Sequence, residues 1–510
     1  MNMHARDLHA EAADGRPHAV VIGAGFGGLA AAVRLGARGY RVTVLERLEQ
    51  PGGRASVFRQ DGFTFDAGPT IITAPFVYEE LWALCGRRMS DDVPMKAMEP
   101  FYRIRFDDGT YFTCSSDHDA MREEVRRLSP GDVEGYERFM EESRVNYAVG
   151  FEKLGDLPFT SVGTMARWLP WMLKRRAHES VWRMVCRHVR HPQVRIALSF
   201  HPLFVGGNPT RVTSIYSLIN HMEREYGVHY CWGGTGALVR GLVGLIEGQG
   251  GSVRCNAPVA QVTTHGRRVT GVRLEDGSVL PASVVVSNAD AAWTYGTLLP
   301  QVRRRRWTDL RLRWLTQSMS VFVWYFGTRG PFDDVDHHTI LMGPRYRGLL
   351  RDIFRRRVLA DDMSLYLYRP TASDPSLAPE GCDAFYALSP VPNLNGSTDW
   401  HTMAEPYRQR IQQRLEDTVM PGLGARVVTS RVFTPLDFRD RLNAPDGAAF
   451  GPEPLLWQSA WFRPHNVSEE VEGLYLVGAG THPGAGVPSV VTSAKVLDRV
   501  VPHASEVLAQ

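Results

Sequence analysis

The chain has 510 residues, of which 44% are hydrophobic and 22% are charged, and its formal net charge is +3. This length is well beyond what one compact core organises, so we expect a globular protein of two or more domains. The small net charge gives no support for a nucleic-acid partner.

The first residues, "MNMHARDLHAEAADGRPH", are polar and carry acids, so they are predicted to form a mobile extension rather than a signal peptide. No apolar run reaches the roughly 20 residues that cross a bilayer, which predicts a protein without a membrane span. The six cysteines stand singly and form no C-x-x-C pair. We therefore expect no zinc site and no disulfide framework, which fits a reducing, cytoplasmic setting.

The stretch "VVIGAGFGGLAAAVRLGARGYRVTVLER" predicts a strand, a tight turn, a helix and a second strand. Gly23, Gly25 and Gly28 form a G-x-G-x-x-G pattern at the turn. In such a unit the first glycine permits the turn, the second admits a pyrophosphate, and the third lets the helix pack closely. Glu46 ends the second strand, where a carboxylate can accept hydrogen bonds from a ribose. The pattern predicts a dinucleotide site that suits either NAD or FAD.

Further glycine-rich segments follow. "EQPGGRAS" comes directly after the second strand, and "GFTFDAGPT" comes shortly afterwards. Near the other end of the chain, "GLYLVGAGTHPGAGVPSVVTSAKVLDRVV" predicts another strand, glycine turn and helix. Together these segments resemble the flavoprotein superfamily that includes amine oxidases and carotenoid desaturases. The resemblance implies FAD, with the G-G-R segment near the phosphates and flavin and the carboxy-terminal turn at the ribityl chain and isoalloxazine.

A narrower resemblance rests on "FTFDAGPT", "SFHPLFVGGNPTRVTSIYSLI", "GGTGALVRGL", "SLYLYRPTASDPSLAPEGCDAFYAL", "QSAWFRPHN" and "GLYLVGAGTHPGAGVPS". These segments are similar to the bacterial-type phytoene desaturases, and the likeness runs from about His18 to Val500. It implies FAD-binding residues throughout the glycine segments and an adenine contact at the backbone of Val259. The implied cofactor-binding residues are Gly23, Gly25, Phe26, Gly27, Gly28, Glu46, Arg47, Gly52, Gly53, Arg54, Gly68, Pro69, Thr70, Val259, Asp290, Gly478, Ala479, Gly480, Gly486 and Val487.

The predicted fold class is α/β, and the flavin domain is expected to be discontinuous because its motifs lie at both ends of the chain. A Rossmann-like FAD-binding domain is assigned to residues 1–90, 227–299 and 456–510. Within it, "GGTGALVRGLVGLIEGQGG" predicts an amphipathic helix. A mixed α+β domain for substrate binding and membrane association is assigned to residues 91–226 and 300–455.

The resemblance implies FAD-dependent desaturation of phytoene to more conjugated carotenes of the lycopene or neurosporene type. Phytoene lacks any polar group, so recognition requires a long apolar tunnel, and "HPLFVGGNP" and "SVFVWYF" supply residues for its wall or for the core. The implied chemistry is hydride transfer to the flavin, followed by reoxidation by oxygen or a quinone. Alternatives are a desaturase of a later or hydroxylated carotenoid, a flavin amine oxidase, and a flavin-binding scaffold without turnover.

No catalytic residue is assigned from the sequence. His482, His465, Glu223 and Glu225 are candidates for a general base, but a structural role is the favoured interpretation of either histidine, and the two glutamates are as ambiguous. The histidines and carboxylates show no spacing typical of metal ligands, so no metal is predicted.

Because phytoene dissolves in lipid, we expect a membrane surface as a partner and a peripheral position on the cytoplasmic face of the cell membrane. The stretch from Thr164 to His191 combines Trp168, Leu169 and Trp171 with basic residues, which suits an interfacial helix or a helix packed on its own domain. "RRRRW", from Arg303, is a second basic cluster, and such runs are commonly solvated.

Overall fold

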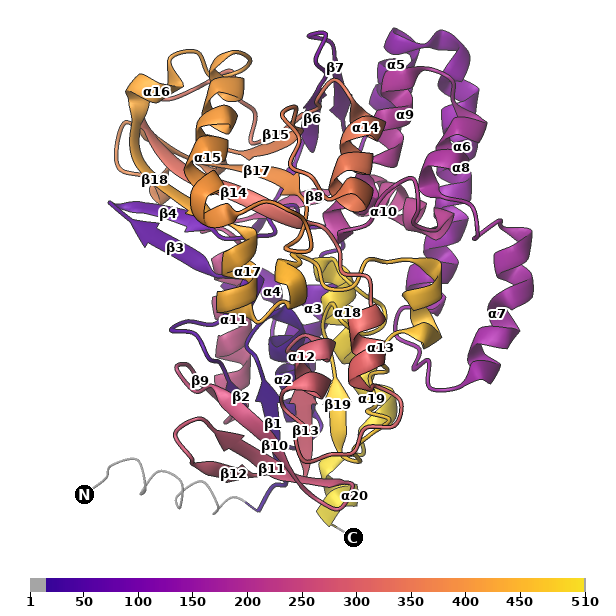
Figure 1. Cartoon of the computed structure of the whole chain (residues 1–510), viewed down its shortest axis with the longest axis vertical. Helices are drawn as coiled ribbons and strands as arrows, with labels where there is room; N and C mark the ends of the chain where they lie inside the picture. The colour runs from indigo at the N-terminus through magenta and orange to yellow at the C-terminus, as the bar shows by residue number, and fades with distance from the viewer. Residues whose placement is uncertain (1–14, 509–510) are drawn as a thin grey trace.

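The computed structural model describes residues 15–508, and most of the predicted amino-terminal extension lies outside these described residues. Figure 1 shows a lower half built on a parallel sheet and an upper half built on a larger sheet with helices beside it. The first and last strands along the chain both belong to the lower half, so the described part of the chain leaves this half and returns to it.

The lower sheet has five strands in the order β19–β13–β1–β2–β9, and every neighbouring pair is parallel. The strands are β1 (His18–Ile22), β2 (Arg41–Leu45), β9 (Ser252–Arg254), β13 (Val284–Ser287) and β19 (Leu474–Leu476). From β1 the chain adds β2 and β9 on one side, and later adds β13 and β19 on the other. The order therefore reverses between β1 and β13, which is where open α/β sheets bind ligands at their carboxyl edge.

Alternating side chains explain how both faces of this sheet are covered. Ala19 and Val21 of β1 pack against helices, whereas Val20 and Ile22 pack against a small antiparallel sheet. The helices are α2 (Phe26–Ala37), α3 (Phe76–Leu84), α11 (Thr235–Gly248) and α18 (Val487–Lys495). The small sheet consists of β10 (Val259–His265), β11 (Arg268–Leu274) and β12 (Val279–Pro281). Because both faces are buried, β1 has no polar side, as its apolar sequence predicts.

The upper sheet has seven strands in the order β18–β14–β17–β16–β15–β6–β7. All its neighbours are antiparallel except β15 and β6. The strands are β6 (Tyr102–Arg105), β7 (Tyr111–Cys114), β14 (Ser320–Arg329), β15 (His338–Leu341), β16 (Leu365–Tyr368), β17 (Cys382–Val391) and β18 (Val427–Phe433). Strand β14, second from one edge, begins with the apolar run SVFVWYF and is buried on both sides.

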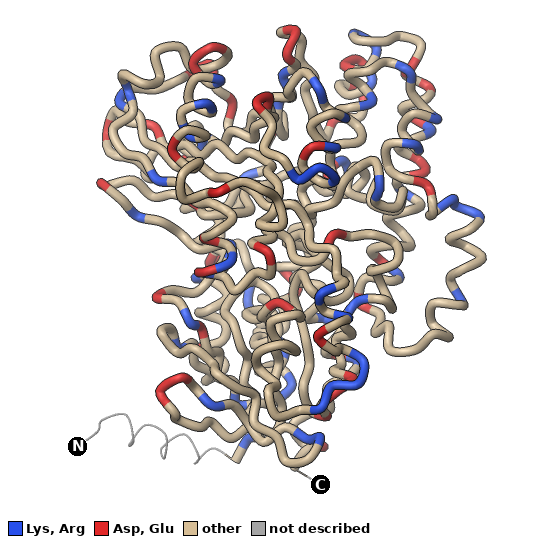
Figure 2. The backbone as a smooth tube through the Cα atoms, viewed as in Figure 1, with Lys and Arg blue, Asp and Glu red and all other residues tan. Residues whose placement is uncertain are grey.

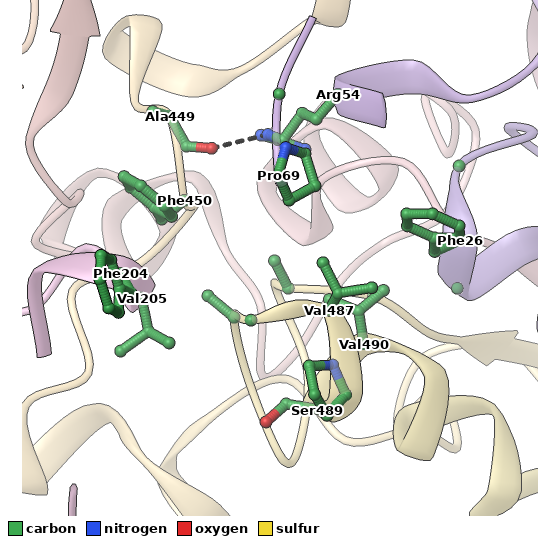
Figure 3. A pocket seen from close by; sticks show the side chains of 18 of the residues that line it. Phe26, Arg54, Pro69, Phe204, Val205, Ala449, Phe450, Val487, Ser489 and Val490 are labelled. Carbon is green, nitrogen blue, oxygen red and sulfur yellow. Dashed lines mark hydrogen bonds between the residues drawn. The ribbon is translucent and has the colours of Figure 1, made fainter. Parts of the chain in front are cut away.

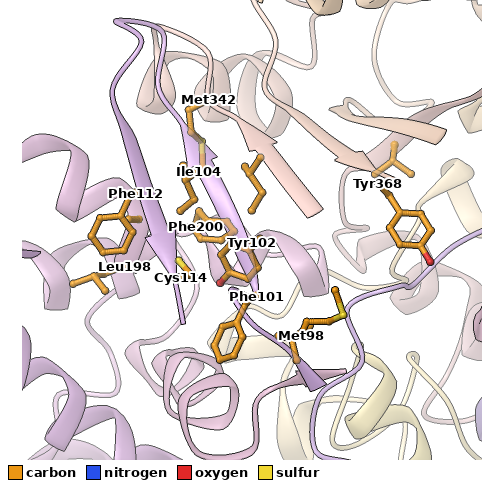
Figure 4. Packing of buried hydrophobic residues seen from close by; sticks show 14 of the residues in the cluster. Met98, Phe101, Tyr102, Ile104, Phe112, Cys114, Leu198, Phe200, Met342 and Tyr368 are labelled. Carbon is orange, nitrogen blue, oxygen red and sulfur yellow. The ribbon is translucent and has the colours of Figure 1, made fainter. Parts of the chain in front are cut away.

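The two faces of β14 enter different cores. Phe322, Trp324 and Phe326 pack beneath α15 (Trp400–Glu416). Val321, Val323 and Tyr325 face the other way, toward the large aromatic core that also includes the residues of Figure 4. The hairpin of β3 (Val57–Gln60) and β4 (Phe63–Asp66) contributes side chains to this second core. It also connects the two halves, because the Tyr325 hydroxyl donates to the carbonyl of Ala67, directly after β4, at 2.6 Å.

A group of helices stands beside the upper sheet (Figure 1). These helices are α5 (His118–Leu128), α6 (Val133–Tyr147), α8 (Val181–His188), α9 (Pro192–Ser199) and α10 (Leu218–Tyr226). A further helix, α7 (Val162–Lys174), projects from the body, and each of its residues is at least partly exposed. The stretch expected to form one interfacial helix is instead split into α7 and α8, since the chain turns between them with Arg176 at φ +51°.

Shorter elements complete the fold. They are α4 (Met89–Asp92), β5 (Met95–Met98), β8 (Val228–Cys231), α12 (Ala291–Gly296), α13 (Asp309–Trp314), α14 (Tyr346–Arg351), α16 (Leu423–Arg426), α17 (Pro435–Leu442), α19 (Leu497–Val500) and α20 (Ala504–Leu508). The predicted α/β class is confirmed, as are the first strand–helix–strand unit and the amphipathic helix at α11. The proposed domain boundaries stay a prediction.

Replacing Gly28 should destabilise the protein, because a Cβ at this position would lie 2.0 Å from the carbonyl oxygen of Gly23. We expect Gly28→Ala to lower the free energy of unfolding by about 1–3 kcal/mol, the usual cost of overpacking. Gly244→Ala in α11 is the matched control, since a Cβ there meets no atom within 4 Å. The control should raise stability by about 0.5–1 kcal/mol. Denaturant titrations followed by tryptophan fluorescence would measure the stability of both variants. Equal unfolding midpoints of the two variants would contradict the close packing at Gly28.

Candidate functional site

Two glycine turns from opposite ends of the chain meet at the carboxyl edge of the lower sheet. Gly23 follows β1 with φ +92°, and Gly478 follows β19 with φ +95°. A Cβ on Gly27 would lie 3.1 Å from the Cα of Gly478, so the two backbones touch. The segment after β2 joins them, since the Gly52 amide donates to the Ala24 carbonyl at 2.8 Å. The three glycine segments of the sequence therefore form one cluster.

Asn288 lies at the centre of this cluster, and the sequence analysis missed it. Its Nδ2 donates to the Gly23 carbonyl at 3.4 Å. A Cβ on Gly25 would approach Nδ2 to 2.9 Å, and one on Gly478 would approach Oδ1 to 2.7 Å. Asn288 directly follows β13, at the carboxyl edge beside β1. A polar residue at the end of an apolar strand was the available signal, but it required knowing that β13 pairs with β1.

A cavity of about 690 Å³ opens at this cluster (Figure 3). Its wall includes most of the residues predicted to bind the cofactor, namely Gly23, Gly25, Phe26, Gly27, Glu46, Arg47, Gly52, Gly53, Arg54, Gly68, Pro69, Thr70, Val259, Gly478, Ala479, Gly486 and Val487. Gly28, Asp290 and Gly480 lie outside the wall. In Figure 3 the Arg54 side chain reaches across the top of the cavity, and its Nε donates to the Ala449 carbonyl at 2.7 Å.

Glu46 is a buried carboxylate at the edge of this cavity. Its two oxygens accept hydrogen bonds from the backbone amides of Ala24, at 2.8 Å, and Leu48, at 3.0 Å. Burial raises the pKa of Glu46, while these amides and Arg47 act in the opposite direction. Because each carboxylate oxygen has two lone pairs, Glu46 keeps acceptor capacity for a hydroxyl group in the cavity.

Asp290 has a structural role that the sequence did not indicate. Its Oδ1 accepts from the amide of Ala292 at 2.8 Å and so caps the start of α12. Burial raises its pKa, and the positive charges of Arg54 and Arg463 oppose that effect. Asp290 therefore lies behind the cavity wall and faces Arg54, whose side chain reaches into the cavity.

Most of the remaining cavity wall is apolar. It is built from Leu203, Phe204 and Val205, from Ile215, Leu218, Ile219 and Met222, from Met319, Val321 and Val323, from Ile340, Met342, Leu349, Leu350 and Leu365, and from Met165, Trp168, Trp171 and Met172. The segment "HPLFVGGNP" and one face of β14 therefore line the cavity, while the opposite face of β14 belongs to the core. Figure 3 shows Phe204 and Val205 on the side opposite Val487.

Three hydroxyl groups interrupt the apolar wall next to the Gly68–Pro69 turn. Thr70 lies 2.6 Å from the hydroxyl of Tyr386 and 2.9 Å from that of Tyr366, all measured between oxygens. The Tyr366 hydroxyl in turn lies 2.7 Å from Nδ1 of His338. Burial raises the pKa of both tyrosines and lowers the pKa of His338, so all these groups are neutral at neutral pH. Both tyrosines come from the upper sheet, some 300 residues beyond Thr70 in the chain.

The four candidate bases separate into two pairs. His482 and Glu223 line the cavity. His465 lies outside the wall, where its ring nitrogens contact the Glu469 carboxylate at 3.1 Å and the Trp461 carbonyl at 3.1 Å. Glu225 is exposed on α10. Within residues 15–508, no group of three or more His, Cys, Asp or Glu side chains is placed to hold a metal ion.

His482 is held in its neutral form. Its Nε2 lies 2.6 Å from the Leu154 carbonyl, and its ring packs on Phe159 with centroids 4.6 Å apart. Burial lowers its pKa to about 4. A neutral ring whose Nε2–H donates to the Leu154 carbonyl satisfies this geometry without a positive charge.

His482 should make stability depend on pH. The pKa of about 4 in the folded protein lies below the ordinary histidine value of 6.5, so the unfolded chain binds the proton first as pH falls. The free energy of unfolding should therefore fall by about 3 kcal/mol between pH 7 and pH 4 through this residue. His482→Gln keeps a donor for Leu154 and should lack this component. Denaturant titrations of both proteins at several pH values would measure the difference, and parallel pH curves would contradict it.

Comparison with known proteins gives a consistent result. Residues 26–496 match the family model of flavin-containing amine oxidoreductases. A neurosporene-forming phytoene desaturase of Cereibacter sphaeroides is 52% identical over 491 residues, covering 95% of each chain. A lycopene-forming phytoene desaturase of Pantoea ananas is 48% identical over 476 residues, covering 93% of this chain and 97% of its own.

Solved structures show the same architecture. Wild-type putrescine oxidase bound to putrescine superposes with a TM-score of 0.62 at 15% identity, covering 97% of this chain and 99% of its own. An oxidoreductase from Methanosarcina mazei gives a TM-score of 0.62 at 18% identity, covering 94% of this chain and 100% of its own. At these identities the likeness concerns the fold.

Proposed function

The chain belongs to the flavin-containing amine oxidoreductase family, and from this premise we propose that it is an FAD-dependent phytoene desaturase. Its products would be more conjugated carotenes of the neurosporene or lycopene type, which are the products of its relatives. One observation of the structure carries the proposal. The cavity that begins at the glycine turns continues into a wall made mostly of apolar side chains.

The cofactor is FAD, and the residues around the glycine turns fit a dinucleotide. Gly25 begins α2 and Gly486 begins α18, and among the described residues neither helix start receives a side-chain cap. Their first amides are therefore available to anions, and the helix dipoles favour a pyrophosphate. The start of α12, by contrast, is capped by the side chain of Asp290, although Ala289 and Trp293 beside it line the cavity. Glu46 is placed to accept a ribose hydroxyl.

A hydrocarbon substrate explains the rest of the wall. Phytoene offers no charge or hydrogen-bonding group, so its binding depends on burying apolar area, worth about 25 cal/mol per Å². The wall supplies that area from helices and strands of both halves of the protein. An amine substrate would instead require groups that stabilise a cation.

Bound FAD supplies the hydride acceptor of the dehydrogenation. The chain's own residues hold the polyene against this end of the cavity and exclude water from it. Thr70, Tyr366 and Tyr386 donate and accept hydrogen bonds among themselves, so these hydroxyls present little free polarity to the substrate. Oxygen or a quinone would then take the electrons.

Cells that make phytoene should become coloured when they express this chain, because each new double bond extends the conjugated system. Chromatography of the extracted pigments should show neurosporene or lycopene in place of phytoene. Gly25→Val is the control, since its side chain would collide with Asn288 and occupy the place of the pyrophosphate. Colour that develops only from hydroxylated precursors would contradict the proposal, and so would peroxide formation from amines in the absence of carotene products.

We further propose that the protein docks on the cytoplasmic surface of the cell membrane through α7. Val162, Leu169 and Leu173 lie on the outer side of this helix and are 59%, 50% and 61% exposed. Trp168 and Trp171 line the cavity from the same helix. One apolar surface of α7 thus faces outward while another faces the cavity, as expected of a helix that admits a substrate from lipid. Among residues 15–508, no helix is long and apolar enough to cross a bilayer.

Basic residues accompany this surface. Lys174 is the last residue of α7, and Arg175 and Arg176 follow it, where Figure 2 shows a run of positive charge. Such a run favours anionic lipid by about 1 kcal/mol per residue near the surface. The other basic cluster is built differently. Its backbone amides at Arg305, Arg306 and Trp307 donate to the carboxylate of Glu470, which anchors the segment to the body.

Charge placed on the outer side of α7 should weaken membrane binding. We expect the double variant Leu169→Glu, Leu173→Glu to bind phosphatidylglycerol vesicles at least tenfold more weakly, since it loses the burial of two leucines and adds repulsion. Vesicle co-sedimentation measures this. Val279→Glu is the matched control, because Val279 is 50% exposed but lies on β12 in the lower half. Equal binding by the double variant and the control would contradict docking through α7.

A further inference from the structure

One carboxylate lies in the apolar part of the cavity wall. Glu223 is on α10, one turn beyond Ile219 and next to Met222, and all three line the cavity. Its side chain is nearly inaccessible, with 3% of the residue exposed. An ionisable group is costly at such a position unless its atoms are paired. The identity of the side chain therefore calls for an explanation.

The two oxygens of Glu223 have different surroundings. Oε2 accepts a hydrogen bond from the Tyr102 hydroxyl at 2.7 Å and lies 3.1 Å from Nε2 of His201. Oε1 is buried and has no hydrogen-bond partner among the described residues. Tyr102 itself is fixed by aromatic neighbours, including Phe200 at a centroid distance of 5.9 Å (Figure 4). The carboxylate is thus anchored through one oxygen and keeps the other free.

A desaturase needs such an oxygen. Removing hydrogen across a CH2–CH2 unit cleaves two C–H bonds: one hydrogen leaves as hydride to the cofactor and the other as a proton, while its bonding electrons become the new double bond. In a cavity that excludes water, the proton requires an acceptor within the wall. His482 also lines the cavity and its Nε2 is engaged with the Leu154 carbonyl, but burial lowers its pKa to about 4, which makes it a weak base.

We propose that Oε1 of Glu223 is the proton acceptor of the desaturation, and that Tyr102 and His201 are positioning residues that hold the carboxylate through Oε2. The proposal rests on the proposed function. The step forms an O–H bond on Glu223 as the substrate C–H bond breaks. Tyr102 and His201, in contact with Oε2, are the groups through which the carboxyl can return its proton before the next turnover.

The groups that face Glu223 determine how pH affects this step. They are Tyr102 on β6, His201 in the turn 201–205, Cys114 on β7 and Arg224 on α10 itself. Burial raises the pKa of Tyr102 and of Cys114, so neither ionises near neutral pH. Tyr102 and Cys114 therefore contribute nothing to the acid limb of the rate profile, which reports the proton acceptor of the reaction.

The test uses the FAD-loaded protein with phytoene in lipid vesicles and follows bleaching of the flavin in a single anaerobic turnover. Glu223→Gln keeps the shape of the side chain but removes its basicity, and we expect bleaching to slow by about 10²–10⁴-fold. Carotene affinity, measured by equilibrium binding, should stay within about threefold of wild type. The acid limb of the pH profile should disappear in this variant. Tyr102→Phe should shift that limb and slow bleaching far less.

Two further measurements separate a proton acceptor from a structural residue. Infrared difference spectra of the cofactor-free protein between acid and neutral pH should show a protonated-carboxyl band that Glu223→Gln lacks. Added formate should restore part of the bleaching rate to Glu223→Ala, because a small carboxylate can occupy the space left. The matched control is Glu453→Gln. Glu453 is 1% exposed and has an unpartnered oxygen among the described residues, but it lies outside this cavity.

The outcomes are distinct. If wild type bleaches with phytoene and Glu223→Gln does so at the same rate, this inference is wrong while the proposed function stands. The inference is also overturned if Glu223→Gln loses flavin content and carotene binding in parallel with its bleaching rate. It is overturned as well if Glu453→Gln slows bleaching as much, or if Glu223→Gln slows bleaching only with hydroxylated carotenoids. If wild type itself fails to bleach with phytoene, the proposed function falls and the inference falls with it.

Discussion

The contact between the glycine turns after β1 and β19 is the constraint on which the rest of the structure depends. The backbone of Gly27 touches that of Gly478, and Asn288 fills the space where side chains of either turn would otherwise lie. This contact requires that the polypeptide leave the lower half, build the upper sheet and helices, and return. The cavity exists because two helix starts, at Gly25 and Gly486, open on the same space. Any side chain at these glycines would separate the two ends of the chain from each other and from the cofactor.

Once this contact is made, the upper half is positioned over the open edge of the parallel sheet. The hairpin β3–β4 follows immediately after the second glycine segment and packs into the aromatic core above, so the two halves share residues rather than meet at a surface. β14 then divides its side chains between the closed core beneath α15 and the cavity. The same strand therefore supplies stability through one face and hydrocarbon recognition through the other.

Local patterns predicted the parts of the site that depend on neighbours in sequence. The strand, turn and helix around Gly23, and those around Gly478, could be recognised because glycine spacing and apolar runs are properties of short segments. Asn288 could not be recognised, because its importance comes from strand pairing between β13 and β1. Asp290 was expected at the cofactor, which stays a prediction; the structure adds that its side chain caps α12, a role that the sequence alone did not indicate. The turn at Arg176 that splits α7 from α8 was also missed, since helix-forming residues continue through it.

The two buried carboxylates of the cavity show why side-chain environment decides function. Glu46 has both oxygens satisfied by backbone amides of its own strand end and of the first turn, so its charge is compensated by elements that the fold must form in any case. Glu223 has one oxygen held by Tyr102 and His201, from elements remote in sequence, and one oxygen unpartnered among the described residues. A fold selected for stability alone favours the first arrangement over the second, because an unpaired buried oxygen costs about 1–3 kcal/mol. The second arrangement is what a reaction that releases a proton into a dry, apolar cavity requires.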